Sequence, residues 1–108
     1  MTSGRRKHLI RIERETETGR DSLNAPVVEW SLLAERWASA HFGAGREQRE
    51  AAQLNAIQAA SFEVLHDPDT AGVTAKDRVV FDGAVWEIKS VAPLGFNEGV
   101  KINAVRVI

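Results

Sequence analysis

The sequence predicts an all-β fold, a small and mainly antiparallel sheet or barrel, from three observations. Several short stretches alternate apolar and polar residues, which is the period of a half-buried strand. An Asp-Gly pair joins two of these stretches as a hairpin turn would. Residues 46–56 are rich in helix formers but hold a single large apolar residue, Leu54. We therefore expect a long loop, or a short helix, between the second and third strands.

Size and composition exclude several classes of protein. The 108 residues suit one domain spanning residues 1–108, and a net charge of −1 argues against attachment to nucleic acid by phosphate neutralisation. Without cysteine there can be no disulfide, thiolate nucleophile or Cys-built zinc site. No apolar run approaches the roughly 20 residues of a spanning helix, so we expect no membrane contact. We expect residues 1–8, with Arg5, Arg6 and Lys7, to form a flexible leader.

Four segments are assigned from their pattern. Residues 9–13 form a first strand with Ile10 and Ile12 on one face, and the polar residues 15–24 form a connecting loop. Residues 57–66 contain the alternating Ala60, Phe62 and Val64 and form a strand. A loop over residues 93–99 precedes a last strand that runs to the end of the chain.

Residues 27–40 are ambiguous. Trp30, Leu33, Ala34, Trp37 and Ala38 fall at i, i+3, i+4, i+7 and i+8, so periodicity alone favours a helix. The strand alternative needs a bulge near Glu35 so that one face collects Val28, Trp30, Leu32, Ala34, Trp37 and Ser39.

The firmest local prediction is a hairpin over residues 78–91, turning at Asp82 and Gly83. This dipeptide readily supplies the positive φ angles of a type I′ turn. The turn fixes the register, with Phe81 opposite Ala84, Val79 opposite Trp86 and Arg78 opposite Glu87. We expect apolar residues on one face and an Arg78–Glu87 ion pair on the other.

No motif points to catalysis. The only suggestive metal-ligand cluster is His66, Asp67 and Asp69 with Asp77 nearby, and a turn in which the Asp67 side chain binds backbone amides explains it better. The sequence lacks a nucleophile elbow, a phosphate-binding loop and a zinc-protease motif. We expect no enzyme, no metal and no cofactor.

Seven aromatic residues leave a second function open. A small barrel that binds single-stranded nucleic acid, like an OB-fold, would stack bases on such side chains. Most of them, Trp30, Trp86, Phe62 and Phe81 included, fit core positions better, while Phe42 and Phe96 lie in glycine-flanked loops. Those two are either exposed contacts or plugs for the barrel ends.

The order of these features resembles the head-closure, or head-tail joining, family of connector proteins from long-tailed phages and gene transfer agents. The resembling pieces are residues 11–13 (RIE), Trp30, Trp37 with Ala38, residues 45–47 (GRE) with Ala51, Ala52 and Gln53, residues 62–64 (FEV), residues 76–83 (KDRVVFDG) and residues 86–88 (WEI). The sequence departs from the family at Trp86, where Tyr or Phe is more usual, and residues 92–99 have no distinctive match.

The resemblance implies that residues 27–40 are a long strand and that the fold is a small β-barrel. It implies a ring of subunits, a stopper, that closes the portal channel of a DNA-filled head, retains the DNA and docks the tail. The implied partners are portal or adaptor ring proteins, tail terminator or tail proteins, further copies of the chain and, transiently, packaged DNA. The implied location is the virion, after assembly in the host cytoplasm. A neighbouring connector, such as a tail terminator or adaptor, is the alternative within this class.

The resemblance also assigns roles to residues, none of them catalytic. The segment after the long strand would face the channel, and we expect residues 43–56 to be mobile in the isolated subunit, since glycines permit movement and alanines permit close packing at an axis. The candidate channel-facing residues are Gly43, Gly45, Arg46, Glu47, Gln48, Arg49, Ala51, Ala52 and Gln53. The residues expected to define the fold are Trp30, Trp37, Phe62, Arg78, Val79, Phe81, Asp82, Gly83, Trp86 and Ile88.

Overall fold

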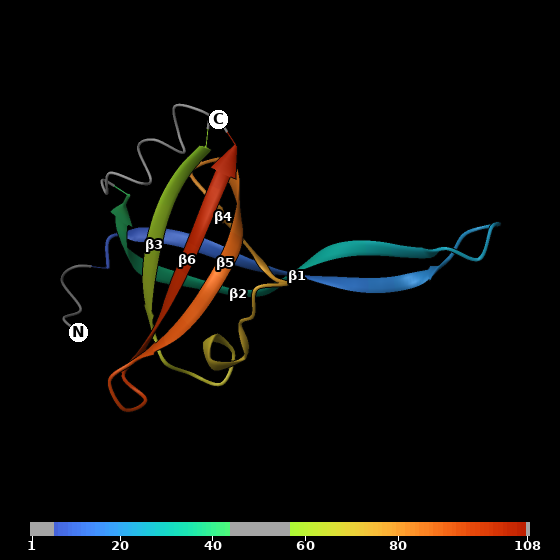
Figure 1. Cartoon of the computed structure of the whole chain (residues 1–108). Helices are drawn as coiled ribbons and strands as arrows, with labels where there is room; N and C mark the ends of the chain where they lie inside the picture. Colours follow the sequence, from blue (N-terminus) through green and yellow to red (C-terminus); the bar gives the residue numbers. More distant parts are fainter. Residues whose placement is uncertain (1–5, 44–56, 108) are drawn as a thin grey trace.

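A computed structural model describes residues 6–43 and 57–107 of the protein (Figure 1). These residues form six strands and one short 3-10 helix. The strands are β1 (His8–Arg20), β2 (Pro26–Phe42), β3 (Ile57–Leu65), β4 (Arg78–Phe81), β5 (Ala84–Leu94) and β6 (Gly99–Val107), and the 3-10 helix is η2 (Thr70–Gly72). No helix in this part of the chain is long and apolar enough to cross a membrane.

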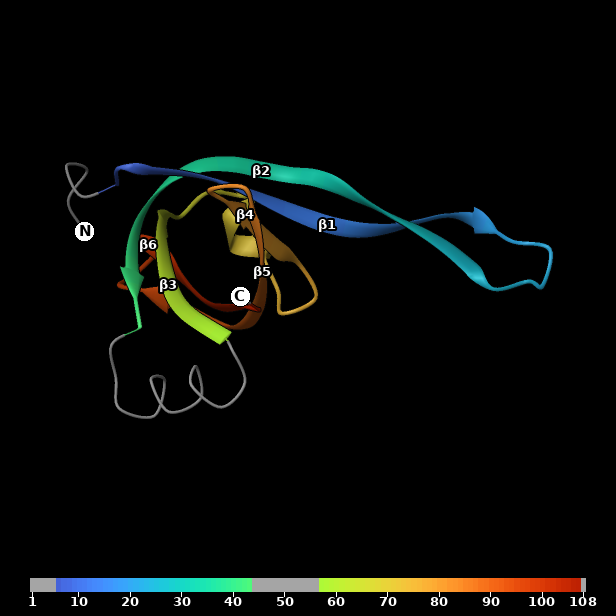
Figure 2. The same cartoon turned by 90° about the horizontal axis from the view of Figure 1, so that it is seen from above.

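The strands close into an antiparallel barrel in the order β1-β2-β3-β6-β5-β4, and a short β1–β4 ladder seals it. Figure 2 looks onto this ring of strands. The predicted all-β class and antiparallel barrel are confirmed. The segment between β2 and β3, predicted to be a long loop or short helix, lies outside the described residues except at its first residue, Gly43.

An aromatic cluster fills the centre of the barrel. Phe62 on β3 and Trp86 on β5 are almost fully buried, and their rings meet edge to face with centroids 5.6 Å apart. Phe81 completes the cluster at 5.5 Å from Phe62. Edge-to-face contacts of this kind add to the stabilisation from burial alone. The interior is completed by smaller apolar side chains, including Ile10, Ile12, Val64, Val79, Ile88 and Ile102.

The β4–β5 hairpin has the predicted register and turn. Phe81 faces Ala84 and Val79 faces Trp86. Asp82 and Gly83 have φ angles of 53° and 75°, as a type I′ turn requires. The loop predicted at residues 93–99 is shorter than expected, because β5 continues to Leu94 and β6 already begins at Gly99.

The predicted Arg78–Glu87 ion pair is wrong, although the two residues do lie opposite each other. Arg78 instead binds Glu13 on its other neighbour, β1, at 2.8 Å, and its guanidinium stacks 4.2 Å from the centroid of Trp30. Glu87 pairs with Lys89 at 3.2 Å. Closure of the barrel brings β1 beside β4, and this places Glu13 within reach of Arg78. The hairpin sequence alone does not reveal this second neighbouring strand.

Strand β2 overturns the helical periodicity of residues 27–40, and a bulge explains why that periodicity misled. Ile12 pairs with Ala34 while Glu13 pairs with Leu32, so Leu33 is an extra residue in β2. A bulge swaps the faces of the strand on its two sides. Ala34 and Ala38 therefore face the core, while Trp37 lies outside. Apolar residues from the two faces combine in the sequence into a spacing that is typical of a helix.

The predicted position of this bulge, near Glu35, is two residues from the observed one, and Ala34 does not share the predicted face. Trp30 and Leu32 lie on the outer face with Glu13, whereas Ala34 lies inside. Trp30 is 37% exposed and Trp37 is 57% exposed, so the two tryptophans share a face as the strand alternative required, but it is the outer face and the expected core position of Trp30 is wrong.

Candidate interaction surfaces

A two-stranded arm projects from the barrel where a connecting loop was predicted. Strand β1 pairs with β4 only from Arg11 to Glu13, and β2 pairs with β3 only from Ser39 onward, so the strand pairing of residues 15–31 lies within their own hairpin. Every residue from 15 to 31 is exposed. Figure 2 shows this arm extending well beyond the ring of strands. Such a ribbon is marginally stable alone and offers unpaired strand edges to a partner.

One face of the arm sets an apolar row beside an acidic row. The cross-strand pairs are Glu17 with Val28, Glu15 with Trp30 and Glu13 with Leu32. The apolar members belong to β2 and are 37–53% exposed. The arm therefore presents apolar side chains bordered by negative charge, which suits a partner surface that is apolar and basic.

The arm tip is a hydrogen-bonded turn that displays Leu23. The Asp21 carboxylate accepts from the backbone N–H groups of Leu23 and Ala25, both at 2.9 Å. The Asp21 N–H donates to the Ala25 carbonyl, and Asn24 takes a positive φ of 62°. Leu23 itself is 87% exposed. The turn is thus held from within while its one large apolar side chain contacts water.

The root of the arm is clamped to the barrel by Arg14. Its guanidinium donates to both carboxylate oxygens of Asp77, at 3.0 and 3.1 Å, and to the Gly72 carbonyl at 2.7 Å. Asp77 is buried and also accepts from the backbone N–H of Thr74. The hydrogen bond to Asp77 raises the pKa of Arg14. A bidentate pair of this kind fixes orientation, so the direction of the arm is set by the barrel.

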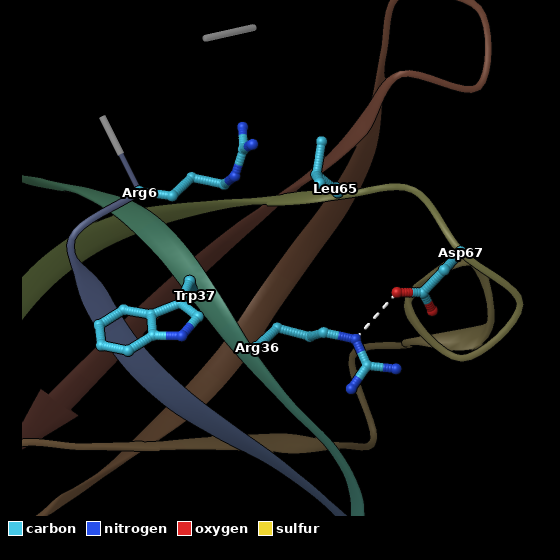
Figure 3. Close-up of a pocket in the computed structure, with 5 residues that line it drawn as sticks. All are labelled: Arg6, Arg36, Trp37, Leu65 and Asp67. Atoms are coloured by element: carbon cyan, nitrogen blue, oxygen red, sulfur yellow. Dashed lines mark hydrogen bonds and ion pairs between the residues drawn. The ribbon is translucent and has the colours of Figure 1, made fainter. Parts of the chain in front are cut away.

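A hollow of about 590 Å³ lies on the barrel between β2 and the end of β3. It is lined by Arg6, Arg36, Trp37, Leu65 and Asp67. Figure 3 shows Arg36 reaching toward Asp67 while the Trp37 indole leaves β2 in another direction. Trp37 and Leu65 are both about half exposed and give the hollow apolar walls.

Arg36 anchors the loop that closes one side of the hollow. It binds Asp67 at 2.9 Å and Asp69 at 3.0 Å. The hydrogen bond to Asp67 raises the pKa of Arg36. Partial burial of Asp67 opposes its ionisation, but the bonds from Arg36 and from the Thr70 N–H outweigh it and hold the pKa of Asp67 below its usual value. The carboxylate stays charged and the loop stays tied to β2.

The suggested metal cluster is a turn, as the sequence favoured. One oxygen of Asp67 accepts from the backbone N–H groups of Asp69 and Thr70 at 2.9 Å, and the other binds Arg36. Asp77 belongs to the separate clamp at the root of the arm. Within residues 6–43 and 57–107 no group of three or more His, Asp or Glu side chains is placed to hold a metal ion.

Most of the predicted channel-facing residues lie outside the described part of the chain. Only Gly43 is described, and its N–H donates to the Ala59 carbonyl at 2.7 Å. The role predicted for Gly45, Arg46, Glu47, Gln48, Arg49, Ala51, Ala52 and Gln53 stays a prediction, as does the flexibility predicted for residues 1–8, of which 1–5 are not described.

The residues predicted to define the fold occupy two kinds of position, inside the barrel or at its turn and on its outer face. Phe62, Val79, Trp86 and Ile88 are buried in the barrel, and Arg78 and Phe81 are half-buried beside them. Asp82 and Gly83 make the hairpin turn. Trp30 and Trp37 instead lie on the outer face, on the arm and at the hollow, where they are available for contacts with other molecules.

The aromatic residues divide between the barrel interior and the surface. Phe62 and Trp86 are inside the barrel, and Phe42 packs on Trp86 and Phe81 with centroids 6.1 and 6.2 Å apart. Phe42 is the last residue of β2 and not part of a loop, and it is 45% exposed, so it shows features of both predicted alternatives. Phe96, 89% exposed on the β5–β6 turn, fits the alternative of an exposed contact.

Sequence reasoning missed the arm and its tip. A segment without an apolar period was assigned to a loop, but a ribbon exposed on both faces needs no such period. The signals that could have predicted the arm lie within its own residues. Thr16 and Thr18 alternate with charged residues, which is compatible with a strand, and the Asp21–Asn24 stretch has the composition of a turn.

Two solved structures are similar to the chain. The solution structure of a protein from Shigella flexneri 2a has a TM-score of 0.71 at 17% identity and covers 98% of this chain and 96% of that one. A chain from the virion of a native gene transfer agent particle has a TM-score of 0.66 at 18% identity and covers 94% of both. At these identities the likeness concerns the fold.

A search of curated proteins finds no match. The family comparison is specific: residues 1–102 match the phage head completion proteins, which confirms the resemblance found in the sequence. Because that match spans nearly the whole chain, the protein belongs to the phage head completion protein family.

Proposed function

We propose that this protein is a structural, non-enzymatic virion component that forms a ring at the head-tail interface. The ring closes the portal channel, retains packaged DNA and provides the surface on which the tail docks. Its partners are portal or adaptor proteins on one side and tail terminator or tail proteins on the other. It acts in the virion after assembling in the host cytoplasm. Membership of the phage head completion family supports this proposal.

The projecting arm is the structural feature that best supports the proposal that the protein forms a ring. A ring of identical subunits needs two different, complementary surfaces on each copy, because each copy contacts its neighbours head to tail. A closed barrel has few free strand edges, so a barrel alone offers little for such contacts. The arm adds an exposed surface of residues 15–31, clamped at its root by Arg14 and Asp77.

The charge of the chain is compatible with a channel through which DNA must later pass. A protein that grips DNA gains affinity by neutralising many phosphates with basic side chains. This chain has a net charge of −1, and its arm is acidic on one face. A ring of such subunits would hold DNA by obstruction rather than by adhesion.

The proposal is tested with particles that are produced without this protein. Particles produced without it are expected to package DNA and then lose it, and to lack tails, while expression of the wild-type chain restores both properties. The measurements are DNA content per purified particle after nuclease treatment and the fraction of tailed particles by electron microscopy. Tailed particles that keep full-length DNA without this protein would contradict the proposal.

A further inference from the structure

We propose that the arm tip of one copy seats in the hollow of a neighbouring copy, with Leu23 packed against Trp37 and Leu65. This inference rests on the proposed ring and names the contact that would build it. It commits to a second copy of this chain as the occupant of the hollow.

The tip is a hydrogen-bonded turn that holds Leu23 in an exposed position before any binding. Leu23 is 87% exposed, yet the turn around it is held by the two hydrogen bonds to the Asp21 carboxylate, by the Asp21–Ala25 backbone bond and by a 3.0 Å bond from Arg20 to the Asn24 carbonyl. A side chain presented by an ordered turn loses little conformational freedom on binding. Burying this side chain against an apolar surface of another molecule would be favourable.

The hollow offers the matching surface. Trp37 and Leu65 are 57% and 48% exposed and form its apolar walls. Arg36 and Asp67 close one side through their 2.9 Å ion pair, so this side of the hollow is held in place before binding. A volume of about 590 Å³ leaves room for a leucine and part of the turn that carries it.

The tip and the hollow of the same copy cannot meet. Both are joined by β2, which runs without interruption from Pro26 beside the tip to Arg36 at the hollow. Ten residues of extended strand span about 33 Å. The contact therefore forms between copies, and because it joins two different surfaces it propagates from copy to copy and closes only as a ring.

Charge favours a second copy over nucleic acid as the occupant. Residues 15–31 hold the four carboxylates of Glu15, Glu17, Asp21 and Glu29 against the single guanidinium of Arg20, a net charge of −3. Since the whole chain carries −1, the remainder carries +2. The arm of one copy is thus attracted to the body of the next, whereas DNA phosphates would repel it.

Cysteine pairs test the contact, because the chain has no cysteine of its own. Particles are assembled with the double variant Leu23→Cys and Leu65→Cys, oxidised mildly and analysed on a non-reducing gel. We expect a ladder of covalent multimers ending at the full ring. Leu23→Cys and Leu65→Cys alone each leave one thiol per subunit and are expected to give no ladder.

The matched control pairs Leu23→Cys with Val107→Cys. Val107 is also strongly exposed, and it lies at the far end of the β3–β6 ladder from Leu65, about 26 Å away over eight residues. A ladder from the Leu65 pair and not from the Val107 pair supports the contact. Equal ladders, or none from the Leu65 pair in particles that hold a full ring of copies, overturn it while leaving the proposed function standing. Absence of the protein from intact particles overturns both.

Discussion

Single polar side chains position both candidate interaction surfaces. Arg14 joins β1 to Asp77 and so directs the arm, while Arg36 joins β2 to Asp67 and Asp69 and so shapes the hollow. In both cases an arginine on a strand holds a loop that follows a different strand. The pKa of Asp67 is lowered, so its ion pair with Arg36 is lost only when the pH falls through that lowered value.

Replacing Asp67 with asparagine tests that contact. The change removes the charge facing Arg36 but leaves an oxygen to accept from the Asp69 and Thr70 amides. Because the folded-state pKa of Asp67 lies below its unfolded value, the ionised carboxylate stabilises the fold above the unfolded pKa, and this contribution is lost as pH falls through the folded pKa. We expect Asp67→Asn to lower the free energy of unfolding by about 0.2–1 kcal/mol at neutral pH.

The measurement is urea unfolding of wild type and variant in steps from about pH 7 to about pH 2, where the two curves should converge. A stability difference of the same size across that whole range would refute the assigned role of the charge.

The aromatic cluster allows a second comparison between single residues. Phe62 is fully buried and meets Trp86 and Phe81, whereas Phe96 is 89% exposed. We expect Phe62→Ala to cost about 3–5 kcal/mol of unfolding free energy and Phe96→Ala to change it by less than about 0.5 kcal/mol. Denaturant midpoints measure both. Similar losses at the two positions would be inconsistent with this core.

At the scale of elements, the confirmed predictions are those that depend on residues close together in the sequence. The Asp82-Gly83 turn fixed the β4–β5 register because a type I′ turn needs nothing beyond its own two residues. Strand β3 was predicted because Ala60, Phe62 and Val64 alternate in a fully regular strand. Both features are encoded within about ten residues.

Two elements could not be predicted locally. The Leu33 bulge in β2 is defined by its pairing with β1, so residue spacing in β2 alone pointed to a helix and then to a core position for Trp30, which lies outside. The arm is exposed throughout and its apolar side chains do not enter the core, so no core-facing period marks it in the sequence. The candidate interaction surfaces were therefore the least predictable part, since their side chains face outward and leave no core-facing pattern in the sequence.

Amide exchange tests the arm as an element. In the isolated subunit we expect residues 15–31 to exchange much faster than residues 100–105 of β6, which is hydrogen-bonded on both sides to β3 and β5. In assembled particles the arm should become protected, because a neighbour covers it. Hydrogen-deuterium exchange with mass spectrometry measures both states. An arm as protected as β6 in the free subunit, or unchanged on assembly, would count against a role in assembly.

At the scale of the molecule, the barrel and the arm divide the structural tasks. The barrel holds nearly all of the buried apolar core, and the arm holds an exposed surface whose strand pairing lies within its own hairpin. The acidic arm and the more basic remainder give each copy an electrostatic polarity. A head-to-tail ring uses both properties, and the family to which the chain belongs acts in completing phage heads.

The central claim is that the protein forms a ring in the particle, and its copy number tests this most directly. Quantitative mass spectrometry of purified, DNA-filled particles gives the ratio of this chain to the portal protein. We predict a fixed ratio that corresponds to one ring per particle. Absence from intact DNA-filled particles, or a ratio that varies between preparations, would contradict the account.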